Sequence, residues 1–178
     1  ILQNSQPEQI ADFETVMTTL LDDSQQAEAK PGREEVVSVA IAAMARSQAS
    51  VARESLRQLF ETVPDRRDQI ARAIAQNPVS EDWAIFVKAL QFTDLTTAQL
   101  CVQALSKIEQ QPEKPDAYRW LILAGLKLGD QGGKPTVGLL EKWTGTAPQG
   151  EGVADALASY QAWYAETFPD APPAELPQ

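Results

Sequence analysis

The sequence contains no histidine, one cysteine and only two methionines among its 178 residues. Without histidine, the chain cannot form a Ser-His or Cys-His nucleophile pair, and it offers no imidazole ligand to zinc or non-haem iron. A single cysteine, Cys101, excludes an internal disulfide and a four-thiolate metal cluster. No apolar run approaches the roughly 20 residues that a membrane-spanning helix needs. We therefore expect no cofactor, no metal and no catalytic residue in this chain, and no membrane span.

Acidic residues dominate the charge. The chain has 25 Asp and Glu against 15 Lys and Arg, which gives a net charge of −10. Binding to a phosphate backbone needs clustered positive groups, so we expect no nucleic-acid partner. The one basic segment holds the arginines Arg46, Arg53, Arg57, Arg66, Arg67 and Arg72. We interpret them as solvated residues on helix faces in weak local pairs, with a docking patch for an acidic neighbour as the alternative.

Apolar residues recur at steps of three and four through most of the chain, which is the period of an amphipathic α-helix. Breaks rich in Pro, Gly and Asp divide this pattern into about nine helices. We expect helices near residues 7–22, 33–45, 49–60, 64–76, 81–90, 96–108, 115–128, 135–144 and 153–167. No segment alternates β-branched and polar residues, so the sequence predicts an all-α fold.

Particular residues are expected to begin and end these helices. Ser80 and either Thr96 or Thr97 are predicted N-caps, because their hydroxyls can accept hydrogen bonds from backbone N–H groups. Gly129 is predicted to end a helix in the left-handed conformation, and Pro135 to begin the next one.

The spacing of the helices predicts a repeat. Their expected starts near residues 33, 65 and 96, and near 49, 81 and 115, recur about every 32 residues, as in solenoids of helix pairs. Residues 51–56 and 100–105 resemble the second helices of HEAT-type repeats. We therefore expect a right-handed α-α superhelix over residues 1–168, followed by a proline-rich extended linker over residues 169–178.

The glycine-rich segment 129–136 invites comparison with a phosphate-binding loop. Leu128 stands where the first glycine should be, Pro135 displaces the hydroxyl that would meet magnesium, and the segment follows a helix rather than a strand. The sequence therefore favours a helix C-cap and a turn.

Other candidate groups have structural interpretations. The acid pairs Asp22–Asp23, Glu34–Glu35 and Glu81–Asp82 lie beside helix ends or turns, where they compensate helix dipoles. Cys101 lies in an apolar stripe and is expected to be buried and inert. The tryptophans are expected to fill seams between helices, with a ligand cleft as the alternative. They are Trp83, Trp120, Trp143 and Trp163.

The last third of the chain resembles a known arrangement. Residues 139–145 (Leu-Leu-Glu-Lys-Trp-Thr-Gly), residues 156–170 and the Pro-Ala-Glu-Leu-Pro tail are similar to the end of the HEAT-repeat region in large exported bacterial proteins. These proteins join a quinoprotein-type dehydrogenase-like propeller, HEAT repeats and a C-terminal c-type cytochrome domain. The resemblance implies that the chain is a fragment of such a protein, periplasmic or exported. The haem-binding Cys-x-x-Cys-His motif is absent from this chain, so the haem would lie outside it.

We therefore expect a non-enzymatic scaffold or inter-domain docking module, whose partner is another protein or neighbouring domains of the same polypeptide. The chain begins with Ile1 and shows no signal peptide, which is consistent with an excised or processed piece. Two alternatives stay open. One is a carboxylate-only enzyme, such as a lyase or glycosidase, with two acids facing each other across a cleft. The other is a small-ligand carrier with a closed interior cavity.

Overall fold

The computed structural model describes residues 33–46, 50–92 and 94–176. Within these ranges the chain contains helices and no strand, which confirms the prediction of an all-α chain. The chain forms two compact units, residues 1–77 and residues 78–178. The predicted helix over 7–22, the pair Asp22–Asp23 and the side chain of Glu34 lie outside the described residues.

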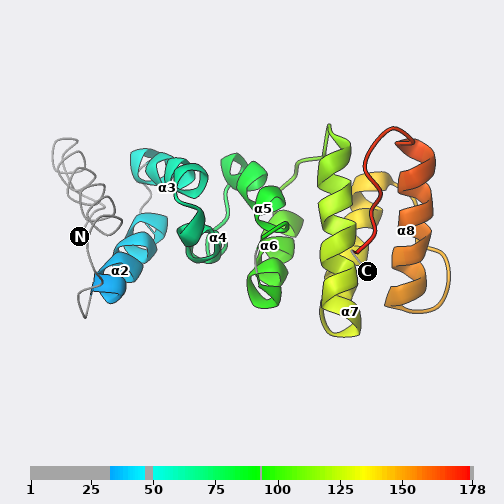
Figure 1. The fold of residues 1–178 in the computed structure, drawn as a ribbon, viewed down its shortest axis with the longest axis horizontal. Coiled ribbons are helices and arrows are strands. Elements are labelled where there is room, and N and C mark those ends of the chain that lie inside the picture. Colours follow the sequence, from blue (N-terminus) through cyan, green and yellow to red (C-terminus); the bar gives the residue numbers. More distant parts are fainter. Residues whose placement is uncertain (1–32, 47–49, 93, 177–178) are drawn as a thin grey trace. The chain divides into compact units, whose positions relative to one another are not determined.

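The described part of unit 1 contains three α-helices that all pack against one another (Figure 1). They are α2 (Arg33–Arg46), α3 (Ser50–Thr62) and α4 (Arg67–Ile74), and a 3₁₀ turn, η2 (Pro64–Arg66), leads into α4. The core is formed by the apolar stripes that the periodicity predicts, and its most buried side chains are Ile41, Met44, Leu56, Phe60, Ile70 and Ile74. Val51, near the start of α3, is exposed.

The interpretation of the arginines is correct for two of them and wrong for a third. Arg57 pairs with Glu54 and Arg72 with Asp68, both at 2.9 Å and within one helix, as predicted. Arg53, however, is only 6% exposed. Its guanidinium donates to backbone carbonyls at the C-terminal ends of two helices, so this arginine is part of the core of unit 1.

Unit 2 begins with a 3₁₀ turn, η3 (Ser80–Asp82), and continues with α5 (Trp83–Ala89), α6 (Leu95–Lys107), α7 (Pro115–Thr144) and α8 (Val153–Thr167). Helix α7 contacts α5, α6 and α8, so it is the central element of this unit (Figure 1).

The predicted N-caps of unit 2 are replaced by neighbouring residues. Asp94 caps α6, because its carboxylate accepts a hydrogen bond of 2.9 Å from the Thr97 N–H, so the prediction of Thr96 or Thr97 was wrong. Val79 is the N-cap of η3 in place of Ser80. The Asp82 carboxylate accepts a hydrogen bond from the Val79 N–H, and its side chain is fully buried. Asp82 is therefore a structural residue that fixes the entry into α5.

Helix α7 consists of two helical segments that meet at Gly129. This glycine has φ +54° and ψ −151°, a conformation that is open to glycine and strained for other residues. The chain reverses direction at this glycine. A Cβ on Gly133 would lie 3.7 Å from the carbonyl oxygen of Gly125, eight residues earlier, and a continuous helix would keep these two residues far apart. The prediction of a break at Gly129 is thus confirmed, but helical geometry resumes at once, and Pro135 lies inside the second segment rather than at its start.

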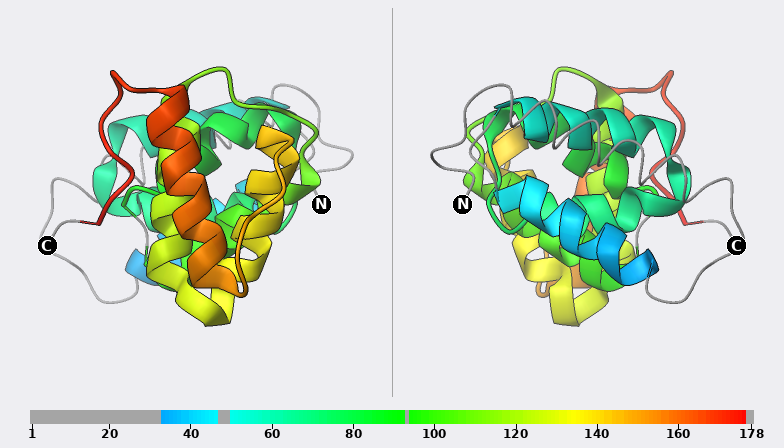
Figure 2. Two further views of the ribbon diagram at one scale, coloured as in Figure 1. Left: turned by 90° about the vertical axis from the view of Figure 1, so that its right-hand side faces the viewer. Right: turned by 90° about the vertical axis from the view of Figure 1, so that its left-hand side faces the viewer.

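Helix α8 packs closely on both segments of α7 (Figure 2, left). Small residues permit this approach: a Cβ on Gly125 would meet Leu157, and one on Gly133 would meet Val153. After α8 the described part of the tail is non-helical, as predicted, and it returns along α7 and α8 (Figure 2).

The helix starts recur at nearly the predicted intervals. They lie at Arg33, Pro64 and Leu95, and at Ser50, Ser80 and Pro115. The stacking of successive pairs into a superhelix stays a prediction. In the described part of the chain, no helix combines the length and the apolar character that crossing a membrane requires.

Candidate functional site

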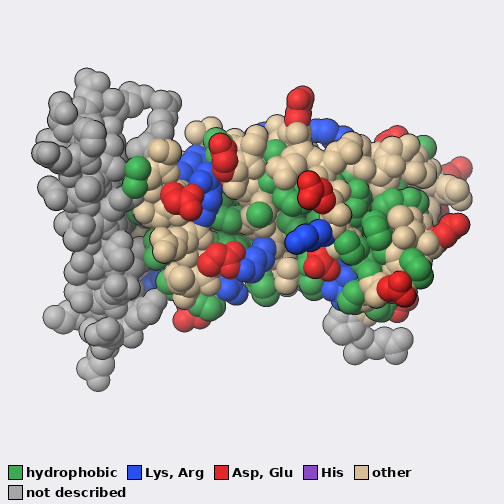
Figure 3. All heavy atoms as spheres, turned by 90° about the horizontal axis from the view of Figure 1, so that it is seen from above, with side chains coloured by type: hydrophobic (Ala, Val, Ile, Leu, Met, Phe, Trp, Pro, Cys, Tyr) green, Lys and Arg blue, Asp and Glu red, His purple; other side chains and the backbone are tan. Residues whose placement is uncertain are grey.

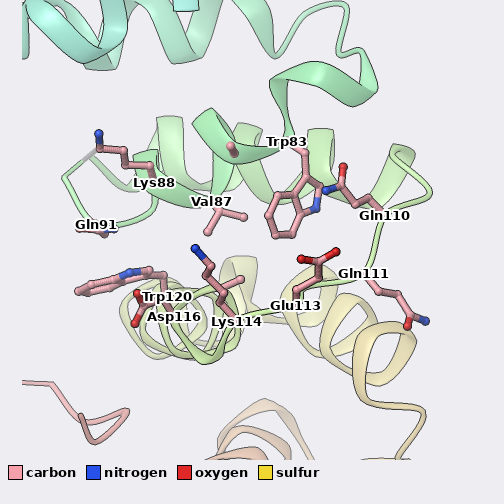
Figure 4. Close-up of a pocket in the computed structure, with 12 residues that line it drawn as sticks. Trp83, Val87, Lys88, Gln91, Gln110, Gln111, Glu113, Lys114, Asp116 and Trp120 are labelled. Atoms are coloured by element: carbon pink, nitrogen blue, oxygen red, sulfur yellow. The ribbon is translucent and has the colours of Figure 1, made fainter. Parts of the chain in front are cut away.

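Unit 2 contains a cleft of about 490 Å³ between α5 and the segment that leads into α7 (Figure 4). This volume falls in the range of ligand pockets. One wall comes from α5 and its end. The other comes from residues 110–120, where Pro115 begins α7 directly after the extended residue Lys114. The lining residues are Trp83, Ala84, Val87, Lys88, Gln91, Gln110, Gln111, Glu113, Lys114, Asp116, Ala117 and Trp120.

Two half-buried indole rings stand at opposite ends of the cleft (Figure 4). The Trp83 ring is backed by Trp143, with the ring centroids 5.9 Å apart. The Trp120 ring is covered by the Arg119 guanidinium, whose central carbon lies 4.4 Å from the ring centroid. Both rings are therefore held in position before any ligand arrives.

Most polar side chains of the cleft have unused hydrogen-bonding capacity. Figure 4 shows Glu113 and Lys114 reaching toward α5 from the opposite wall. The Trp83 indole N–H has no hydrogen-bond partner among the described residues. Six further cleft side chains take part in no hydrogen bond or ion pair within the described part of the chain. They are Gln91, Gln110, Gln111, Glu113, Lys114 and Asp116.

The charges of the cleft are balanced, with two lysines and two acids. Both acids, Glu113 and Asp116, belong to the wall that precedes and begins α7, whereas α5 contributes Lys88 and no acid to the lining. A two-carboxylate hydrolysis needs acids on opposite sides of the bond that breaks. This cleft presents both on one side.

A cluster of aromatic rings lies behind the cleft. Tyr118 is its centre: its ring centroid lies 6.0 Å from that of Trp143, 5.2 Å from Trp163 and 5.7 Å from Phe168. Tyr164 joins the cluster through Phe168 at 5.3 Å. Burial raises the pKa of Tyr118, and it also raises the pKa of Tyr164, with the Arg119 charge opposing this increase. The cluster therefore supports the cleft with neutral, closely packed rings.

Two buried tyrosines, Tyr164 of this cluster and Tyr160 of the same helix, differ in their hydrogen bonds and allow a matched test. The Tyr160 hydroxyl donates to the Thr146 carbonyl at 2.9 Å, whereas the Tyr164 hydroxyl is buried without a partner among the described residues. We expect Tyr160→Phe to lower the free energy of unfolding by about 1 kcal/mol, since a buried acceptor loses its donor. Tyr164→Phe should leave it unchanged or raise it by up to about 1 kcal/mol, since it removes an unpaired polar group. Chemical denaturation followed by tryptophan fluorescence measures both, and equal losses would contradict the assignment.

The sequence-based candidates have mixed outcomes. Cys101 is fully buried, as predicted. Trp143 is buried, as the seam-filling interpretation predicts, whereas Trp83 and Trp120 are half-buried and line the cleft. That the cleft takes a ligand stays a prediction. Within segment 129–136 only Gly129 departs from helical geometry. The predicted end of a helix at Gly129 is confirmed, and the residues that follow it are helical.

The polar residues of the cleft are not among the candidates that the sequence indicates. Gln110, Gln111, Glu113 and Lys114 lie in a short connection that carries no recognised motif. The available signal was the unusual density of long polar side chains just before a helix-starting proline.

Within the described ranges, no group of three or more His, Cys, Asp or Glu side chains is placed to hold a metal ion. No family model matches the chain, and neither a curated protein nor a solved structure shows significant similarity to it.

Proposed function

We propose that this chain is a non-enzymatic docking module that holds a protein or a neighbouring domain, and that the cleft of unit 2 is its binding site. The observation that supports this most directly is the pair of preorganised indole rings, surrounded by six polar side chains that take part in no hydrogen bond or ion pair within the described part of the chain. Protein interfaces concentrate their binding energy in such aromatic anchors, and a polar rim around them excludes water.

Apolar side chains beside the cleft extend this surface. Phe92 follows the cleft residue Gln91 in the turn after α5, and Leu95 is the first residue of α6. Their side chains are 52% and 53% exposed. Charged and apolar side chains are interspersed on the face seen in Figure 3. Large exposed apolar residues next to a charged rim are typical of a surface that a partner covers.

The wider setting of this module is also part of the proposal. The resemblance of the last third to the HEAT-repeat region of exported dehydrogenase-like proteins fits a helical stack that orients an electron-transfer domain against a dehydrogenase-like domain. In that setting the haem and the reaction belong to other parts of the parent protein. The carboxylate-only enzyme has less support, because Glu113 and Asp116 share one wall of the cleft.

Site-specific photo-crosslinking tests the docking function. A benzoylphenylalanine placed at Gln111, in the cleft, should give a discrete adduct in the native cell extract or within the parent protein. The same group at Gln103, an exposed residue of α6 outside the cleft, is the matched control. The adduct should disappear when Trp120→Ala is added.

The proposal requires that the crosslink be specific to the cleft. No adduct from position 111, the same adduct from position 103, or an adduct that survives Trp120→Ala would each reject the cleft as the docking site.

A further inference from the structure

The protein already holds one proline-rich segment, its own tail, partly through Arg119, the residue before the cleft residue Trp120. The Nε atom of Arg119 donates to the Pro173 carbonyl at 2.9 Å, and the side-chain amide of Gln161 donates to the Ala174 carbonyl at 2.6 Å. Ala174 is buried as a result. The tail is thus fixed by side-chain donors that reach backbone carbonyls, and Arg119 at the same time stacks on the Trp120 ring.

The cleft offers the same kinds of group at its own surface. Trp120 contributes to both places, since it lines the cleft and carries the arginine that holds the tail. The side-chain amides of Gln91, Gln110 and Gln111 and the ammonium of Lys114 are donors without an intramolecular acceptor in the described part of the chain. The cleft therefore combines indole walls with unused side-chain donors, and side-chain donors are what hold the carbonyls of the tail.

We propose that the cleft binds an uncharged, proline-rich segment of the docking partner in the polyproline II conformation. This inference rests on the proposed docking function and names the chemistry of the partner. Polyproline II leaves every backbone carbonyl free to accept, and a proline has no N–H that would need an acceptor. Proline rings pack on flat aromatic faces, and aromatic-lined grooves are the usual receptors for such segments.

The charges of the cleft support an uncharged occupant. Two lysines and two acids line it, so a segment with charge of either sign would meet repulsion as well as attraction. A proline-rich segment is also stiff before it binds, so it loses little conformational entropy in a shallow site. The balanced charge of the cleft and the stiffness of a proline-rich segment thus both favour an uncharged, proline-rich ligand.

Isothermal titration calorimetry of the full chain with a capped decaproline peptide tests this inference. We expect saturable binding, and no saturable binding of a capped decapeptide of alternating Gly and Ser. Trp120→Ala and Gln110→Ala should each weaken binding, the first by about tenfold or more. Gln103→Ala, on an exposed face of α6, is the matched control for Gln110→Ala and should leave the affinity unchanged. Unchanged circular dichroism shows that each variant is folded.

Three results would overturn the inference. Decaproline could fail to bind at millimolar concentration, or bind equally well to the Trp120→Ala chain. It could also lose affinity with Gln161→Ala, which would show that it exchanges with the tail instead of entering the cleft. If decaproline fails while the crosslink from position 111 persists, the docking function stands with a different partner chemistry. If both fail, the docking function falls too.

Discussion

Replacing Arg53 with methionine is expected to lower the free energy of unfolding of unit 1 by about 3–5 kcal/mol. The guanidinium donates to the Ala45 carbonyl at 3.2 Å, to the Ile74 carbonyl at 3.5 Å and to the Asn77 carbonyl at 2.5 Å. Ala45 lies at the end of α2, and Ile74 is the last residue of α4. Helix C-termini carry carbonyls without intrahelical partners and a partial negative charge, so one buried cation satisfies two helix ends at once.

Methionine keeps much of the aliphatic volume of Arg53 but leaves these carbonyls without a donor. Arg57→Met is the matched control on the same helix, because Arg57 pairs with the exposed carboxylate of Glu54, and it should change the free energy by less than about 1 kcal/mol. All four tryptophans lie in unit 2, so far-ultraviolet circular dichroism is the appropriate probe for unit 1. A loss below about 1 kcal/mol for Arg53→Met would show that water replaces the guanidinium at both helix ends.

The example of Arg53 shows what the sequence could and could not reveal. The period of the apolar residues depends on the helix itself, so α2, α3 and α4 could be located from the sequence alone. The partners of Arg53 lie up to 24 residues away in the chain, and they depend on how the three helices pack. A basic residue on an amphipathic helix therefore looks the same in the sequence whether it is solvated or buried.

The candidate site was harder to predict for the same reason. Trp83 and Trp120 have the helical spacing of core residues, and only the packing of α5 beside the start of α7 leaves them half exposed in one cleft. The polar wall comes from residues 110–114. These residues form a cleft only because Trp83 and Val87 of α5 lie opposite them. Local pattern thus located the helices, whereas the cleft depends on contacts between segments far apart in sequence.

The break at Gly129 could be predicted only in part from the sequence. A glycine after an apolar stripe is a local signal, and it predicted the end of the first helical segment of α7 correctly. The early return to helical geometry has no such signal, because a proline is compatible with the first turn of a helix and Pro135 lies beyond that turn. The reversal places Gly133 beside α8, and no local pattern indicates that contact.

Replacing Gly133 with alanine is therefore expected to destabilise unit 2 by about 2–3 kcal/mol, although alanine is the better helix former. The new Cβ would lie 2.3 Å from a methyl carbon of Val153, and this side chain is buried and stiff because it is branched at Cβ. Helix α8 would have to move away from the second segment of α7, on which it packs. Tryptophan fluorescence during chemical denaturation follows this unit, since all four tryptophans belong to it.

A matched glycine on the same segment separates crowding from helix propensity. A Cβ on Gly138 would meet nothing within 4 Å, so Gly138→Ala should raise the free energy of unfolding by about 1 kcal/mol. Adding Val153→Ala to Gly133→Ala should recover part of the loss, because it removes the methyl group that the new Cβ meets. If Gly133→Ala were as favourable as Gly138→Ala, α8 would be free to shift on α7, and the close packing of these helices would not be what fixes the shape of unit 2.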